Sequence, residues 1–218
     1  TGEDPQVDVV IIAVTYNSAP IIADFLQALP SALDGIESAR TVIVDNASHD
    51  ETVEIVRRLA PAAVVIESGA NIGYAAAINL AIREHVGRRG VYVLNPDAIP
   101  ASGSVRALAD AADGDATVGM AVPRIVDADG RLKFSLRREP TLGRALGEAL
   151  LGGRRAARFG PLGDLVRDVT YYQDGATADW ATGAAMYIRQ DVLAVVGPFD
   201  ERFFLYSEET DYALRMRD

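Results

Sequence analysis

Short apolar runs alternate with amphipathic segments along most of the chain. Residues 7–14 form a nearly continuous run rich in valine and isoleucine, which is typical of a strand covered on both faces. Shorter runs of the same kind recur, and we predict strands at 7–14, 41–44, 63–66, 91–94 and 118–122. The segments between them carry apolar residues at helical spacing and predict helices at 18–29, 51–59, 73–85 and 102–112. Strands that alternate with helices indicate a mostly parallel sheet covered by helices.

The regular alternation ends after the fifth predicted strand. The sequence Asp127-Ala128-Asp129-Gly130 predicts the turn of a hairpin, and residues 139–179 predict helix and loop without a clean strand period. The elements predicted after them are a strand at 180–188, a helix at 191–196 and a last helix that begins near Ser207. Because this last helix runs to the end of the chain, we interpret residues 1–218 as one α/β domain that is truncated at its C-terminus.

Composition narrows the classes of function. The chain has 218 residues, 49% of them hydrophobic, which is enough for a full core. It has no cysteine, so disulfides, zinc-thiolate sites and thiol nucleophiles are excluded. A net charge of -10 argues against nucleic-acid binding, which needs a basic surface. A phosphorylated ligand then needs local neutralisation, by a divalent cation, helix N-termini or a few arginines.

Two further absences concern membranes and export. No run of about 18 apolar residues occurs, so the sequence predicts no membrane-spanning helix. The first residues, 1–6, are polar and acidic and are not typical of a signal peptide.

Polar side chains follow several of the predicted strands, at the edge where open parallel sheets bind ligands. They are Thr15, Asn17, Asp45, Asn46, Asn95 and Asp97, together with the stretch Asn71-Ile72-Gly73-Tyr74 at the start of a predicted helix. Each has a structural alternative: Asn17 and Ser18 as helix caps, Asp45 in a turn, Gly73 as a turn glycine, Asp97 as a loop acid. Their recurrence at one edge predicts a site for a base, a ribose or a cation.

Common nucleotide signatures are missing. The chain has neither a phosphate loop ending in glycine-lysine-serine or -threonine nor a three-glycine dinucleotide fingerprint after its first strand. The two histidines, His49 and His85, lack metal-ligand spacing, and we interpret both as structural.

A second acidic cluster lies at Ser207-Glu208-Glu209-Thr210-Asp211. One interpretation is purely structural: Ser207 caps a helix, the acids favour its dipole, and Asp211 pairs with Arg215 one turn on. The other assigns one glutamate as a general base that deprotonates an acceptor hydroxyl. Trp180, the only tryptophan, is by itself more typical of a core residue than of a sugar platform.

Taken in order, seven segments resemble family 2 glycosyltransferases, in particular the branch that includes bacterial rhamnosyltransferases of cell-wall and surface-polysaccharide synthesis. They are Val14–Ser18, Val44–Asp50, Asn71–Asn79, Leu94–Asp97, Trp180–Met186, Gly197–Glu201 and Phe203–Asp211. The resemblance spans nearly the whole chain. It implies a GT-A fold, which is a Rossmann-like, mostly parallel α/β sheet with helices on both faces. It also implies a nucleoside-diphosphate sugar donor, a divalent cation (Mg²⁺ or Mn²⁺) and inversion at the anomeric carbon.

The resemblance also implies site residues by position. Asp97 becomes the metal ligand, Asp45 recognises a pyrimidine, and Trp180 and Gly183 lie near the donor or acceptor sugar. Glu209 is the candidate base. The residues implied to bind the nucleotide are Thr15, Tyr16, Asn17, Asp45, Asn71, Gly73, Asn79 and Asn95.

The chain departs from the family pattern at two positions. Asn95 stands where the fuller metal motif has aspartate, so this loop supplies one charged ligand. Glu209 replaces the usual aspartate with a side chain that reaches about 1 Å further, and a shift of about 1 Å can cost about a hundredfold in rate. Glu208 therefore remains an alternative base. In the family, a further metal-binding histidine often lies downstream, at positions that come after residue 218 here, so the resemblance implies that the chain as given lacks part of the site.

We favour dTDP-rhamnose as donor, with UDP-sugars next, and a saccharide or lipid-linked acceptor. No nucleic acid is expected as a partner. We expect a cytoplasmic enzyme, with peripheral contact at the inner face of the membrane if its acceptor is lipid-linked. Two alternatives are a nucleotidyltransferase and a non-catalytic nucleotide-sugar binding module. Five arginines, interpreted as solvated or as contacts for phosphates or lipid head groups, are Arg137, Arg138, Arg144, Arg154 and Arg155.

Overall fold

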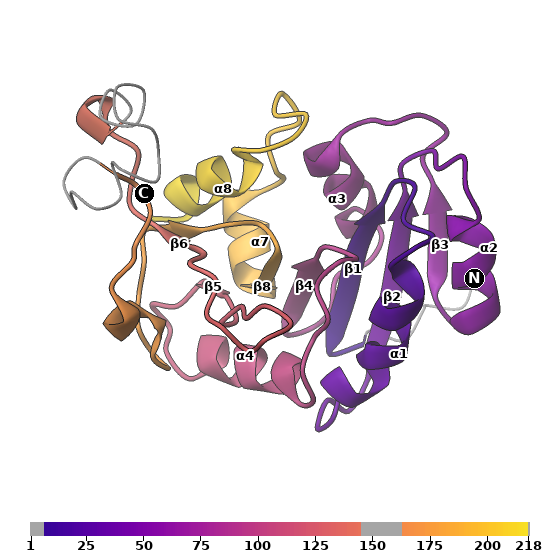
Figure 1. Ribbon diagram of the computed structural model, residues 1–218, viewed down its shortest axis with the longest axis horizontal. Coiled ribbons are helices and arrows are strands. Elements are labelled where there is room, and N and C mark those ends of the chain that lie inside the picture. Colours follow the sequence, from indigo (N-terminus) through magenta and orange to yellow (C-terminus); the bar gives the residue numbers. More distant parts are fainter. Residues whose placement is uncertain (1–6, 145–162, 218) are drawn as a thin grey trace. The chain divides into compact units, whose positions relative to one another are not determined.

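A computed structural model describes residues 7–144 and 163–217 (Figure 1). The chain divides into two compact units. The first, here called the sheet unit, comprises residues up to 123 and residues 183–208. The second, here called the hairpin unit, comprises residues 124–182 and those from 209 onward. We describe each unit separately.

The sheet unit is built on a six-stranded sheet with the order β3-β2-β1-β4-β8-β5. The first four strands in this order are parallel, and β8 is antiparallel to both of its neighbours. The mostly parallel sheet predicted from the sequence is therefore confirmed. The strands are β1 (Val9–Thr15), β2 (Ala39–Asp45), β3 (Val64–Glu67), β4 (Gly90–Leu94), β5 (Met120–Ala121) and β8 (Ala185–Arg189).

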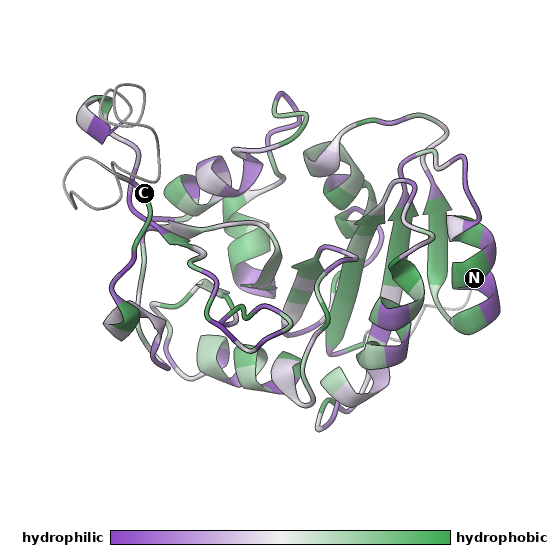
Figure 2. Ribbon diagram, viewed as in Figure 1, coloured by the Kyte–Doolittle hydropathy of each residue, from purple (hydrophilic) through white to green (hydrophobic). Residues whose placement is uncertain are grey.

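Helices cover both faces of this sheet. Strand β1 is buried along its whole length, and its alternate residues Val9, Ile11 and Ala13 belong to the core cluster that includes side chains of α1, α2 and α4. On the other face, α3 contacts β1 and β2, and α7 contacts β4 and β8. Figure 2 shows hydrophobic strands beside helices that are hydrophobic on one side and polar on the other. The helices are α1 (Ile22–Ala32), α2 (Thr52–Leu59), α3 (Tyr74–Ile82), α4 (Ser104–Asp113) and α7 (Gln190–Val196).

The hairpin unit contains short elements. Strand β6 (Leu136–Arg137) pairs antiparallel with β7 (Trp180–Ala181), and a 3-10 helix, η1 (Val169–Tyr172), lies between them in the sequence. A bridge between Val126 and Leu132 closes the hairpin predicted at 127–130. The final helix is α8 (Glu208–Arg217).

The predicted strand at 180–188 is wrong as a single element. The structure has β7 and β8 there, separated by residues 182–184. The backbone N–H of Thr182 donates to Ser135 in the hairpin unit, whereas β8 pairs with β4 and β5 in the sheet. One apolar run thus serves two sheets, and hydropathy alone does not show the break. Among the described residues, no helix is both long enough and apolar enough to cross a membrane.

Candidate active site

A pocket of about 310 Å³ opens in the sheet unit, where β1, β2 and β4 end and α3 begins. It brings together several residues predicted from the sequence: Thr15, Tyr16, Asn71, Gly73, Asn95 and Asp97. The other residues that line it are Val14, Ser18, Ile21, Asn46, Tyr74, Pro96, Phe204 and Leu205. No lysine, arginine or histidine is among these lining residues.

Thr15 and Asp45 face each other across the last register position of β1 and β2. The Thr15 hydroxyl donates to Asp45 Oδ1 at 2.9 Å, and the Ser48 hydroxyl donates to the same oxygen at 2.6 Å. The Ser48 backbone N–H donates to Oδ2 at 2.8 Å. Asp45 is 3% exposed and is not among the residues that line the pocket. Its carboxylate is thus fixed beneath the pocket wall by neighbours from two strand ends.

Asn17 joins the two loops that follow these strands. Its backbone N–H donates to Ser48 Oγ at 2.8 Å, and its side-chain oxygen accepts from the backbone N–H of His49 at 2.8 Å. The residue has a φ of 50°, which asparagine tolerates better than most residues. Helix α1 starts later than predicted, at Ile22, and no side chain caps it. The alternative that Asn17 caps this helix is therefore wrong.

Asn46 and Asn71 fix the entry to α3. The Asn46 amide donates to Asn71 Oδ1 and to the Gly73 carbonyl, each at 3.2 Å, and its own oxygen accepts from Ile72 N–H at 3.2 Å. Asn71 Oδ1 also accepts from Gly73 N–H at 3.2 Å. The oxygen of Asn71 is therefore engaged with protein, and none of the described residues accepts a hydrogen bond from its amide nitrogen.

Gly73 allows a close approach between α3 and the loop that contains Phe204. It has a φ of 89°, and a Cβ at this position lies 2.7 Å from the Phe204 carbonyl oxygen and 2.9 Å from its ring. The next backbone N–H, of Tyr74, donates to that same carbonyl at 2.8 Å. Only glycine combines this backbone conformation with this contact. The interpretation of Gly73 as a turn glycine accounts for its backbone conformation. It does not account for the contact with Phe204, which also shapes the pocket wall.

Asn95 and Asp97 follow β4. The Tyr74 hydroxyl donates to Asn95 Oδ1 at 2.8 Å, and the Asn95 backbone N–H donates to Ala184 at 2.9 Å. The Tyr74 hydroxyl also lies 3.4 Å from the carbonyl oxygen of Gly183. Asp97 is exposed and is the one carboxylate that lines the pocket in the part of the chain that the structure describes. Nowhere in residues 7–144 and 163–217 do three or more histidine, cysteine, aspartate or glutamate side chains form a group able to hold a metal.

Asn79, expected to border the nucleotide, has another place in the structure. It is 2% exposed and is not among the pocket-lining residues. Its amide donates to the Phe199 carbonyl at 2.8 Å and to Glu201 at 3.0 Å, and its oxygen accepts from Phe199 N–H at 2.9 Å. The side chain therefore holds the loop after α7 against α3.

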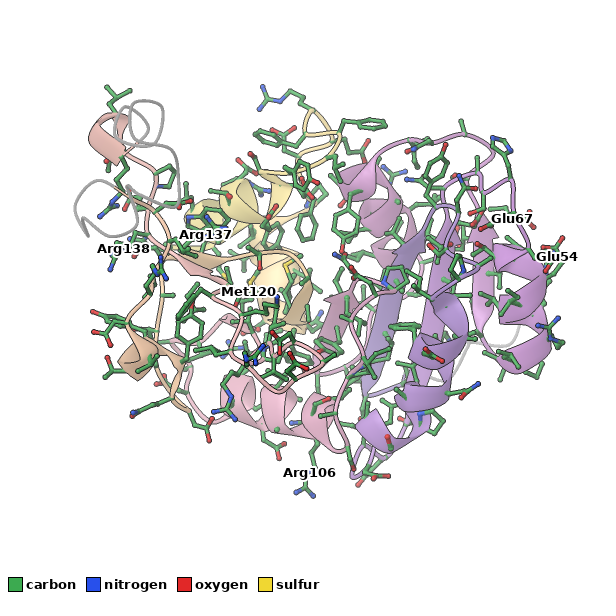
Figure 3. The ribbon with its side chains drawn as sticks, viewed as in Figure 1. Glu54, Glu67, Arg106, Met120, Arg137 and Arg138 are labelled. Atoms are coloured by element: carbon green, nitrogen blue, oxygen red, sulfur yellow. The ribbon has the colours of Figure 1, made fainter. Side chains whose placement is uncertain are left out.

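In the hairpin unit, Trp180 is held by two arginines. Its indole N–H donates to the Arg138 carbonyl at 2.8 Å, and the Arg137 guanidinium lies 5.7 Å from the ring centroid. Figure 3 shows both arginines on the segment that carries β6. Arg137 also forms an ion pair with Asp164 at 2.9 Å, so it is not simply solvated. The guanidinium of Arg144 donates to the Glu139 carbonyl. Arg154 and Arg155 lie outside the described residues.

The two candidate bases differ in exposure. Glu208 is 4% exposed and begins α8. Glu209 is half-buried, and its Oε2 atom is shielded from solvent without a hydrogen-bond partner among the described residues. Two positions on, Asp211 pairs with Arg215 at 2.8 Å, as the structural interpretation predicted.

Sequence reasoning missed part of the pocket wall. Tyr74, Phe204 and Leu205 belong to segments that resemble the family, but no role was predicted for them. Phe204 and Leu205 are 56% and 54% exposed, which is unusual for large apolar side chains. The aromatic-rich run 203–206 was the available signal, because a hydrophobic loop that is not part of a strand or helix often contacts a ligand.

Comparisons with known proteins agree with this geometry. The family described as "Glycosyl transferase family 2" matches residues 10–168. An N-acetylglucosaminyl-diphospho-decaprenol L-rhamnosyltransferase of Mycobacterium tuberculosis is 32% identical over an alignment of 216 positions that covers 94% of this chain and 69% of the relative. The low-salt glycan biosynthesis hexosyltransferase Agl10 of Haloferax volcanii is 29% identical and matches 96% of this chain and 62% of the relative.

Solved structures show the same fold. The mannosyltransferase PcManGT of Pyrobaculum calidifontis superimposes with a TM-score of 0.61 at 22% identity, covering 97% of this chain and 52% of that one. TarS of S. aureus gives a TM-score of 0.60 at 18% identity, covering 96% of this chain and 55% of that one. The predicted GT-A fold is confirmed, and the nucleotidyltransferase alternative is not supported. The chain belongs to glycosyl transferase family 2 and carries its glycosyltransferase domain.

Proposed function

We propose that this protein transfers rhamnose from dTDP-rhamnose to a lipid-linked saccharide in cell-wall or surface-polysaccharide synthesis. The observation that carries the proposal is the 32% identity, over 216 residues, to a rhamnosyltransferase whose name specifies a diphospho-decaprenol acceptor. The chain spans 69% of that relative and about half of the mannosyltransferase structure, at 52%. UDP-sugars are the second choice of donor, since TarS was solved with UDP-GlcNAc.

The pocket fits the diphosphate of such a donor only if its charge is balanced. Among the residues that the structure describes, no cationic side chain lines the pocket, and the chain has a net charge of -10. A divalent cation held by Asp97 fits, because Mg²⁺ commonly binds through one or two carboxylates together with substrate phosphates and water. PcManGT and GalNAc-T7 were both solved with Mn²⁺. When bound, the cation stabilises the charge that develops on the leaving diphosphate.

The proposed reaction is a single displacement with inversion. Glu209 takes the proton from an acceptor hydroxyl, whose oxygen forms a bond to the anomeric carbon from the face opposite the diphosphate. The bond between that carbon and the diphosphate oxygen breaks, and the nucleoside diphosphate leaves with the electron pair. The greater exposure of Glu209, which is half-buried where Glu208 is 4% exposed, supports this role. Glu208 is the alternative base.

A lipid-linked acceptor also suggests where in the cell the protein works. We propose that it works in the cytoplasm at the inner face of the membrane, where such acceptors present their saccharide. Arg138 in the hairpin unit is a candidate contact for lipid phosphates, since its guanidinium bonds only one backbone carbonyl, that of Leu165 at 3.3 Å, among the described residues.

The proposal is tested by incubating the protein with dTDP-rhamnose, UDP-N-acetylglucosamine or GDP-mannose, with Mg²⁺ or Mn²⁺. The acceptor is N-acetylglucosamine diphosphate on a short polyprenyl chain. We expect a mass increase of one deoxyhexose with dTDP-rhamnose alone, and NMR of the product shows the inverted anomer. Transfer from another donor shows that the proposed donor sugar is wrong. Binding of dTDP without transfer or hydrolysis supports a non-catalytic binding module instead.

A further inference from the structure

Of the two polar atoms in the Asn95 side chain, the structure shows which one is hydrogen-bonded to protein and which one is not. Its backbone N–H donates to Ala184 at 2.9 Å, its carbonyl accepts from Ala98 N–H at 3.0 Å, and its side-chain oxygen accepts from the Tyr74 hydroxyl at 2.8 Å. The amide nitrogen, Nδ2, donates to none of the described residues, and Asn95 lines the pocket. Asn95 therefore offers the pocket a hydrogen-bond donor and keeps its acceptor turned to protein.

Tyr74 is itself rigidly placed. Its backbone N–H donates to the Phe204 carbonyl at 2.8 Å, next to the close contact at Gly73. Its ring is half-buried at the first position of α3. Because the backbone at one end and the hydroxyl at the other are both anchored, the side chain of Asn95 has little freedom to turn its oxygen toward the pocket.

Asn71, which also lines the pocket, likewise has its side-chain oxygen bonded to protein and its amide nitrogen without a described partner. Its Oδ1 accepts from Asn46 and from Gly73 N–H. Two amide donors thus face a pocket in which Asp97 is the sole charged side chain contributed by residues 7–144 and 163–217. Neutral donors of this kind suit phosphate or carbonyl oxygens of a nucleotide, whereas a second carboxylate in the place of Asn95 repels them unless a cation intervenes.

We infer that Tyr74 is a positioning residue, whose hydroxyl orients Asn95 so that its amide nitrogen donates to an oxygen of the bound nucleoside diphosphate. The pocket therefore holds the nucleotide partly without the cation. This inference rests on the proposed function, because it requires a nucleoside diphosphate in this pocket.

A double-mutant cycle tests the inference by titration calorimetry with dTDP and UDP, in EDTA and again with Mg²⁺. We expect Tyr74→Phe and Asn95→Ala each to weaken nucleotide binding in EDTA about 3- to 10-fold, the range for one hydrogen bond. The double variant is expected to bind no more weakly than Asn95→Ala alone, because in this inference the hydroxyl affects nucleotide binding by orienting Asn95. Tyr171→Phe, which removes a half-exposed hydroxyl in the hairpin unit, is the matched control and binds like the parent.

Asn95→Asp provides a second test, whose result is not expected to change if Asn95 only stabilises the fold. We expect weaker dTDP binding in EDTA and a lower Mn²⁺ concentration at half-saturation, because the new carboxylate replaces a donor with a metal-binding oxygen. Additive losses in the cycle, or an Asn95→Asp protein with unchanged binding and metal dependence, overturn the inference. A parent protein that binds neither dTDP nor UDP overturns the proposed function as well, so the two failures are distinguishable.

Discussion

Asn79 in α3 pairs with both backbone groups of Phe199: its amide donates to the carbonyl at 2.8 Å, and its oxygen accepts from the N–H at 2.9 Å. Two segments that are 120 positions apart in the sequence are joined by this one side chain. The site that the family resemblance assigned to nucleotide contact is, in the structure, a buried bridge between α3 and the loop after α7.

We therefore expect Asn79→Ala to destabilise the protein by about 2–3 kcal/mol, because it leaves buried backbone groups of Phe199 without partners. Equilibrium unfolding in urea measures the loss. Arg83→Ala is the control: it removes an ion pair with Glu201 whose side chains are 65% and 46% exposed, and such a pair contributes about 0–1 kcal/mol. An Asn79→Ala protein of parental stability but weakened nucleotide binding restores the sequence-based role.

Gly73 and Gly69 form a natural pair for comparison. Both have positive φ, 89° and 76°, but an added Cβ meets Phe204 at Gly73 and nothing within 4 Å at Gly69. We expect Gly69→Ala to lose about 1 kcal/mol, the cost of the backbone conformation alone. Gly73→Ala loses more, and its affinity for dTDP falls, because the Phe204 loop must move. Calorimetry and urea unfolding of both variants check this, and equal effects at the two glycines refute the contact.

Asp97 is expected to account for the dependence on metal. In a thermal-shift assay, nucleotide at about 100 Kd adds about 2.7 kcal/mol of stability. With Mn²⁺ present, the parent gains further stabilisation from dTDP, whereas Asp97→Ala shows the same shift with and without the metal. Asp24→Ala, which removes an exposed acid on α1, keeps the parental response. A metal-dependent shift that survives in Asp97→Ala shows that another residue binds the cation.

Glu209→Gln is expected to lower kcat about a hundred- to ten-thousand-fold with little change in the KM for the donor, because it removes a general base. Glu208→Gln is expected to leave kcat within about tenfold of the parent value, because in this proposal Glu208 does not transfer the proton. Steady-state kinetics with dTDP-rhamnose measure both. If the two effects are reversed, Glu208 is the base.

Asp8 gives the stability of the protein a defined pH dependence. A hydrogen bond from Arg88 holds the pKa of the Asp8 carboxyl below its usual value, with smaller contributions from Ser38. A depressed pKa stabilises the fold above the pKa of the unfolded chain, about 3.9, and this stabilisation is lost as pH falls through the folded value. The difference in urea midpoint between parent and Asp8→Asn is thus constant from neutral pH down to about 5 and shrinks below about 4. A difference that stays constant down to about pH 3 contradicts the assignment of this pH dependence to Asp8.

The sequence predicted the sheet well because its signal is local. The apolar run at 7–14 predicts β1, because a strand covered on both faces must be apolar throughout. The structure has this strand at Val9–Thr15. The hairpin at 127–130 was equally local, because one short turn sequence carries the information. The short strand β6 was missed, since two residues give no period to detect.

The site was harder to predict, because its contacts join distant segments. The sequence placed Thr15 and Asp97 correctly at strand ends, and these residues line the pocket. It could not show that Asp45 lies beneath the wall, held by Thr15 and Ser48, or that Tyr74 reaches Asn95, 21 positions away. Hydrogen bonds of this kind depend on three-dimensional placement, which periodicity does not encode.

The chain leaves the sheet after β5 and returns at β8, and these two strands are hydrogen-bonded neighbours. The pairing of β5 with β8 is therefore made inside the sheet unit, and lengthening the chain between these two strands costs little in chain entropy. Recombination and protein engineering can accordingly change that stretch in sequence and in length while the strands of the sheet unit keep their order.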